Sequence, residues 1–127
     1  MELLKERILR DGRVLGDDVL QVDSFLNHQI DVDLLTKMGA EFFRLFSHSS
    51  VNKIVTVESS GIGVACITAQ YFSVPVVFAK KGHSRNVGTE VYQSEVYSFT
   101  KAKSFPITIS KAYLNEGDRI LIIDDFL

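Results

Sequence analysis

The order strand, loop, helix, strand in residues 53–79 constrains the fold more than any other feature of the chain. Lys53–Val57 (KIVTV) is a compact β-branched run, which favours a buried strand. Ile62–Phe72 is rich in Ala and Ile at helical spacing, and Pro75 opens a second β-branched run, Val76–Ala79. Two strands joined through a helix pair in parallel. The sequence therefore predicts an α/β fold with a doubly wound parallel sheet flanked by helices.

The first half of the chain predicts a small N-terminal hood region and one long helix. Residues 1–11 have a helical apolar period, and residues 14–22 favour two short strands or a strand and a turn. Asp31 or Asp33 can cap a helix that keeps its amphipathic spacing to about residue 47.

The second half predicts a long loop followed by three strands. Residues 80–93 hold glycines and basic side chains with little apolar periodicity, which is typical of a mobile functional loop. Residues 95–100 and 105–110 alternate like an antiparallel pair, and residues 119–124 resemble a central strand. A central parallel strand requires a crossover helix after it, and the chain stops at Leu127. We therefore expect residues 1–127 to be a single incomplete domain, truncated at the C-terminus.

Composition and charge exclude several classes of function. The 14 Lys and Arg against 16 Asp and Glu give a net charge of −2, so we expect no nucleic-acid partner. No run approaches the roughly 20 apolar residues of a membrane span, and the charged N-terminus lacks a signal sequence. The single cysteine, Cys66, has no internal disulfide partner and is expected to be a buried packing residue. A cytoplasmic location fits these features best.

Two motifs at strand ends could carry chemistry. Asp124 and Asp125 follow the isoleucines of the last strand, at the edge where open α/β sheets bind ligands. Glu58–Gly61 (ESSG) ends one strand and begins a helix, so its N–H groups and hydroxyls can bind a phosphate. Taken alone, both motifs are also consistent with helix capping or with carboxylates in a solvated loop.

With the basic segment Lys80–Arg85 (KKGHSR), these motifs resemble a known family. The succession VESSGI, VVFAKK, VYSFTK and GDRILIIDDFL is similar to the type I phosphoribosyltransferases, and VDSFLNHQID is similar to their bacterial members that act on xanthine. The resemblance covers essentially all 127 residues. It implies a purine salvage enzyme that converts xanthine and phosphoribosyl pyrophosphate (PRPP) to xanthosine monophosphate and pyrophosphate.

The resemblance also implies roles for individual residues. Asp124 and Asp125 are expected to form the catalytic pair that faces the ribose hydroxyls. Leu20 and Asn27 are expected to contact the purine, although the residues alone favour Asn27 as a turn residue. Mg²⁺ is expected to arrive with PRPP, and no metal ligand is assigned within the chain. The expected PRPP contacts are Ser59, Ser60, Gly61, Lys80, Lys81, Tyr97 and Ser98.

The family's phosphate loop continues from the acidic strand end with a small residue, a polar residue and a glycine, which would follow Leu127. We therefore expect the reading frame to continue, and the activity of the 127 residues alone stays open. Two alternatives also stay open: an adenine- or guanine-type transferase, and a non-catalytic transcription regulator that senses PRPP. Such a regulator normally carries a DNA-binding module, for which the segment before Val14 leaves no room. The resemblance further implies a homodimer.

Overall fold

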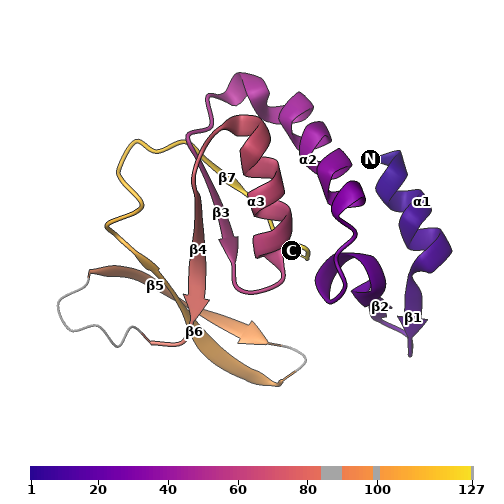
Figure 1. Cartoon of the computed structure of the whole chain (residues 1–127). Helices are drawn as coiled ribbons and strands as arrows, with labels where there is room; N and C mark the ends of the chain where they lie inside the picture. The colour runs from indigo at the N-terminus through magenta and orange to yellow at the C-terminus, as the bar shows by residue number, and fades with distance from the viewer. Residues whose placement is uncertain (84–89, 99–100, 127) are drawn as a thin grey trace.

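The computed structural model describes residues 1–83, 90–98 and 101–126. In this part of the chain, no helix is long and apolar enough to cross a membrane. Figure 1 shows the arrangement of the elements. In chain order they are α1 (Glu2–Asp11), β1 (Arg13–Leu15), β2 (Val19–Gln21), the π-helical turn η1 (Asp23–Asn27), α2 (Val32–Phe46), the 3₁₀ turn η2 (Ser47–Ser49), β3 (Lys53–Val57), α3 (Gly61–Phe72), β4 (Val76–Lys81), β5 (Val91–Ser98), β6 (Lys103–Ser110) and β7 (Ile120–Ile122).

The main sheet has five strands in the order β5-β6-β4-β3-β7. β3 pairs in parallel with β4 and with β7, which confirms the predicted β-α-β unit. β6 pairs antiparallel with both β4 and β5, so the predicted antiparallel pair is also confirmed. The sheet is therefore mixed, because the β5–β6 hairpin extends the parallel part, as the predicted parallel unit and antiparallel pair together require.

The three α-helices of the described residues pack on one core cluster. α2 contributes Leu34, Leu35 and Met38, and α3 contributes Val64, Ala65 and Ala69. Ile54 of β3 and Ile123 after β7 belong to the same cluster, and α1 packs against it through partly buried apolar residues. The helices of the described residues thus pack on the face of the sheet that carries Ile54, which agrees with the predicted sheet flanked by helices.

Among the described residues β7 is the outer strand beside β3, and its central place in a longer domain stays a prediction. Ile120 and Ile122 point to the face opposite the core cluster and are 41% and 65% exposed. Cys66 is also exposed, because the buried side of α3 passes through Val64, Ala65, Thr68 and Ala69. Its expected packing role is therefore wrong.

The strands on both sides extend into the segment that the sequence predicted as a loop, residues 80–93. Lys80 and Lys81 belong to β4 because they pair with Thr108 and Ile107 of β6, and β5 already begins at Val91. Long-range pairing overrides the low apolar content of these residues. Residues 84–89 of this loop and 99–100 of the next predicted strand lie outside the described residues.

The N-terminal hood, which comprises residues 1–31, is anchored to the core through η1. Phe25 is fully buried and Leu26 nearly so, within the same core cluster as Ile123. Arg7 of α1 lies over the Phe25 ring at 5.0 Å and contacts Asp31 Oδ2 at 2.5 Å. Asp31 also caps α2 by accepting from Leu34 N at 3.0 Å, as predicted. The hood is therefore fixed to the helical side of the core.

An ion pair joins the segment before β7 to the start of β3. Lys53 Nζ contacts Asp118 Oδ2 at 2.8 Å, and these side chains are only 15% and 9% exposed. Asn52 Nδ2 and Asn115 N also donate to the Asp118 carboxylate. The hydrogen bonds from Lys53, Asn115 and Asn52 lower the pKa of Asp118 to about 2. This cluster aligns β7 with β3.

We expect Asp118→Asn to lower the melting temperature at pH 7. Because the folded-state pKa of Asp118 lies below its unfolded value near 4, its stabilisation is complete above about pH 4 and is lost as the pH falls toward 2. Melting curves of the two proteins should therefore converge at low pH. Asp33→Asn is the control, because the Asp33–Lys37 pair is exposed and should contribute little. Equal losses from both substitutions would contradict the role given to Asp118.

Candidate active site

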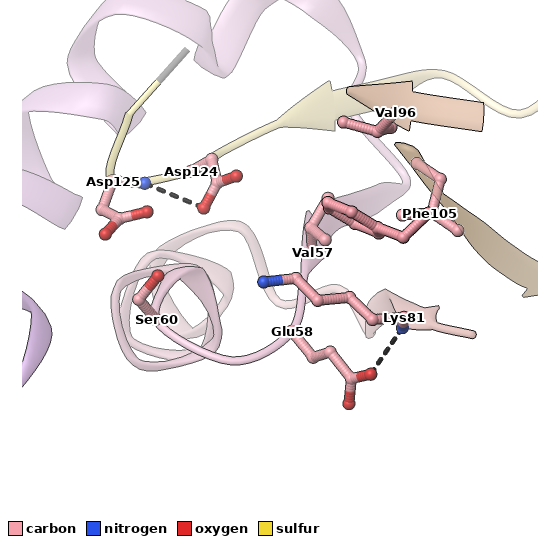
Figure 2. A pocket seen from close by; sticks show the side chains of 9 residues that line it. Val57, Glu58, Ser60, Lys81, Val96, Phe105, Asp124 and Asp125 are labelled. Carbon is pink, nitrogen blue, oxygen red and sulfur yellow. Dashed lines mark hydrogen bonds between the residues drawn. The ribbon is translucent and has the colours of Figure 1, made fainter. Parts of the chain in front are cut away.

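The carboxyl ends of β3, β4 and β7 meet at one edge of the sheet and surround a cavity of about 240 Å³. Parallel pairing produces this convergence, because it brings the ends of all three strands to the same side. Figure 2 shows the polar side chains on one side and apolar side chains of the hairpin on the other. The lining residues are Val57, Glu58, Ser60, Lys81, Val96, Phe105, Ile107, Asp124 and Asp125.

Asp124 and Asp125 are the acidic side of the cavity. Ile123 N donates to Val55 O at 2.9 Å, which aligns the segment with β3 up to the residue before the pair. Asp125 N donates to Asp124 Oδ1 at 2.9 Å. Burial, a hydrogen bond with Asp125 and the charge of Asp125 raise the pKa of Asp124 to about 6. Two adjacent carboxylates in a partly buried site therefore resist ionising together.

Asp125 behaves differently because it has more hydrogen-bond donors. Burial raises the pKa of Asp125, but hydrogen bonds from Asn27, Asp124 and Ser60 outweigh burial and lower it below its usual value. Asn27 Nδ2 lies 3.1 Å from Asp125 Oδ2 and connects the hood to the cavity across 98 positions of sequence. Asp125 is thus the more readily ionised member of the pair.

The loop between β3 and α3 forms the base of the site. Glu58 N donates to Ala79 O at 3.0 Å, and Glu58 Oε1 accepts from Lys81 N at 2.5 Å, so the loop is tied to the end of β4. Gly61, the first residue of α3, is buried against Thr56 Oγ1 and Asp124 Oδ1, with which a Cβ would collide. A glycine here lets the start of the helix approach the carboxylates.

The two predicted lysines lie on opposite faces of β4. Lys81 lines the cavity, its ammonium group points toward the acidic pair in Figure 2, and its charge lowers the pKa of Asp124. Its Nζ also lies 5.7 Å from the Phe105 ring centroid. Lys80 is the preceding residue of the strand, so its side chain points away from Lys81, and it does not line the cavity.

Other predicted site residues lie outside the lining of this cavity. Ser59 is exposed beside Ser60, and Tyr97 and Ser98 follow Val96 on β5. Leu20 lies on β2 and is 38% exposed. The roles predicted for these four residues therefore stay predictions.

Sequence reasoning missed the apolar wall of the cavity. Val96 and Phe105 are cross-strand partners in the β5–β6 hairpin, and Ile107 lies two residues further on the same face. The period-two alternation of both strands could have indicated this face. The carboxylate of Glu58 was also missed, although it begins the recognised ESSG motif.

The site has few groups that could hold a metal on their own. No cluster of three or more His, Cys, Asp or Glu side chains suited to a metal ion occurs among the residues described. Mg²⁺ usually retains several waters and binds through one or two carboxylates together with substrate phosphates. The carboxylates of Asp124 and Asp125 fit that pattern better than they fit a closed metal cage.

Solved structures with this arrangement are phosphoribosyltransferases. The adenine phosphoribosyltransferase from Giardia lamblia, complexed with 9-deazaadenine, matches 96% of this chain and 66% of its own with a TM-score of 0.69 and 19% identity. The Saccharomyces cerevisiae enzyme matches 98% of this chain and 72% of its own, also with a TM-score of 0.69, at 17% identity. The fold is therefore the type I phosphoribosyltransferase fold.

No protein-family model matches the chain. Curated relatives are much more similar: the xanthine phosphoribosyltransferases of Ruminiclostridium cellulolyticum and Clostridium novyi are 64% and 62% identical over all 127 residues. That of Clostridioides difficile is 55% identical over 128 aligned residues. The chain spans 67% of the length of each of these three relatives. It belongs to the xanthine phosphoribosyltransferase family.

We expect Gly61→Ala to destabilise the protein by about 1–3 kcal/mol, because the added methyl overpacks Thr56 and Asp124. Gly63→Ala is the matched control two residues later in α3. A Cβ at Gly63 would lie 3.1 Å from Ile30 Cδ1, the end of a flexible side chain, and alanine is favoured over glycine inside helices. Urea unfolding of both variants measures the difference. Equal stability of the two would contradict the close approach described at Gly61.

Proposed function

We propose that the complete product of this gene's reading frame transfers the phosphoribosyl group of PRPP to xanthine, which is a purine salvage reaction. The bond between ribose C1 and pyrophosphate breaks, and pyrophosphate leaves with the electron pair. A bond forms from C1 to a purine nitrogen, which loses its proton. The observation that carries this proposal is the acidic pair beside Ser60, Gly61 and Lys81, in a chain 64% identical to a xanthine phosphoribosyltransferase.

The acidic pair would bind and orient the sugar. Carboxylate oxygens are acceptors for the hydroxyl groups of ribose, and Asp125 is the more strongly ionised of the two. Positive charge develops at C1 as pyrophosphate departs, and a nearby negative charge stabilises it. Asp124 and Asp125 would therefore combine positioning of the ribose with electrostatic stabilisation.

Lys81 and the start of α3, which lie beside the acidic pair, would bind the leaving pyrophosphate. Lys81 supplies a positive charge, and the first N–H groups of α3 around Gly61 favour an anion. The hydroxyl of Ser60 donates to Asp125 in this structure, so Ser59, Ser60 and Lys80 stay assigned to PRPP by resemblance only. Mg²⁺ would enter as its complex with PRPP and neutralise phosphate charge, and no separate protein site is proposed for it.

Leu20 and Asn27 would contact the purine, and an amide can both donate to and accept from an oxopurine edge. Tyr97 and Ser98 stay assigned to PRPP by resemblance only, and they follow Val96 of the cavity lining on β5. For the assembly we propose a homodimer in the cytoplasm. The partly exposed apolar side chains Phe43 and Phe46 on α2 support a protein interface, and light scattering tests the homodimer.

We expect the purified gene product to form xanthosine monophosphate and pyrophosphate from xanthine, PRPP and Mg²⁺. Product formation is measured by chromatography with xanthine, hypoxanthine, guanine and adenine supplied separately. The highest kcat/KM should be that for xanthine. Faster turnover of adenine or guanine would show that the protein is an adenine- or guanine-type transferase. PRPP binding without turnover of any base would favour a PRPP-sensing regulator.

Lys81→Ala should raise the KM for PRPP by about tenfold or more while changing the KM for xanthine much less. A lysine ammonium is a strong partner for phosphate oxygens and has little to offer a neutral purine. Lys80→Ala removes the same charge from the other face of β4, so it should have a smaller effect. Steady-state kinetics with each substrate varied separates the two variants. A rise in the xanthine KM alone would place Lys81 in the base pocket instead.

A further inference from the structure

The hydrogen bond between Asn27 and Asp125 connects two parts of the site that the proposed function treats separately. Asn27 lies in the hood and is expected to contact the base, whereas Asp125 follows β7 and is expected to contact the sugar. The bond from Asn27 Nδ2 to Asp125 Oδ2 is 3.1 Å long and partly buried. The bond therefore joins the expected base contact directly to the expected sugar contact.

The hood holds Asn27 in place through its backbone and its neighbours. The two residues before Asn27, Phe25 and Leu26, are buried in the core. Gln29 N donates to Asp23 O at 2.8 Å and Asp31 N donates to Phe25 O at 2.9 Å, closing the turn on both sides of Asn27. The amide therefore approaches Asp125 from a fixed support rather than from a free loop.

Hydrogen bonds from more than one element hold the Asp125 carboxylate, and the bond from Asn27 is the one that reaches it from the hood. Its neighbour Asp124 is a second carboxylate, and Gly61 contributes no side chain beneath the pair. Ser60, in the loop before α3, is the other side chain that donates to Asp125. Asn27 and Ser60 thus hold the carboxylate between the hood and the base of the site.

We propose that Asn27 is a positioning residue that fixes the Asp125 carboxylate for the ribose, so that the hood and the acidic pair bind substrates as one unit. An amide has two N–H donors and one carbonyl oxygen, and the bond to Asp125 uses one N–H. The second N–H and the carbonyl can still face a purine. Asn27 can therefore bridge base and sugar, and its loss should weaken the binding of either substrate alone. This inference rests on the proposed function.

The test measures PRPP binding without any base present. Isothermal titration of the complete gene product with PRPP and Mg²⁺ measures the affinity. Asn27→Ala should bind PRPP at least about tenfold more weakly than the unsubstituted protein, since the lost hydrogen bond is to a charged group. Asn27→Asp has the same shape but places a second negative charge against Asp125, so its affinity should fall further. Gln29→Ala is the matched control, because Gln29 bonds to Ser24 O within the same hood segment without reaching Asp125.

A double-mutant cycle isolates the pair. In an Asp125→Ala background, Asn27→Ala should cause no further loss of PRPP affinity, whereas independent effects that add would overturn the proposal. Unchanged PRPP binding by Asn27→Ala and Asn27→Asp, with a raised KM for xanthine, would make Asn27 a base contact only and would also overturn it. Melting curves accompany each variant, and the isosteric Asn27→Asp carries the test if Asn27→Ala does not fold. Failure of the unsubstituted protein to bind PRPP would instead refute the proposed function.

Discussion

The parallel pairing of β3 with both β4 and β7 is the constraint on which the rest of the structure depends. It brings three strand ends to one edge, where each contributes a different chemical group: a helix start from β3, an ammonium group from β4 and two carboxylates after β7. The Lys53–Asp118 cluster aligns β7 with β3 from the opposite end of these strands. The Lys53–Asp118 contact and the geometry of the site are therefore linked, because both depend on the register between β3 and β7.

Two adjacent carboxylates in a partly buried cavity repel each other when both are ionised. Their surroundings stabilise the ionised form of Asp125 more than that of Asp124. Asp125 receives donors from the hood and from the loop before α3, whereas the pKa of Asp124 is raised to about 6. Gly61 permits this arrangement, because any side chain there would occupy the space of Thr56 and Asp124. A pair with unequal ionisation presents one firmly negative acceptor to the cavity and avoids the full repulsion of two charges.

Much of the fold could be predicted because local signals agree with it. The β-branched run at Lys53–Val57, the helical period before residue 47 and the alternating strands around residue 105 all correspond to observed elements. Predictions failed where distant pairing decided the outcome. Lys80 and Lys81 became strand residues through their pairing with β6, although their low apolar content predicted a loop. Cys66 has apolar neighbours in sequence, yet it falls on the outer side of α3.

The sequence by itself determined which chemical groups stand at or just after the end of each strand, because ESSG, KK and DD are contiguous motifs at the ends of periodic segments. Only the tertiary structure decided how these groups are used. Strand alternation puts Lys80 and Lys81 on opposite faces, but the pairing of β4 with β6 decides which face lines the cavity. Likewise, nothing in the sequence around Asn27 predicts its hydrogen bond to Asp125, which lies 98 positions away. Contacts of this kind depend on packing of the whole core, which brings together residues that no local periodicity relates.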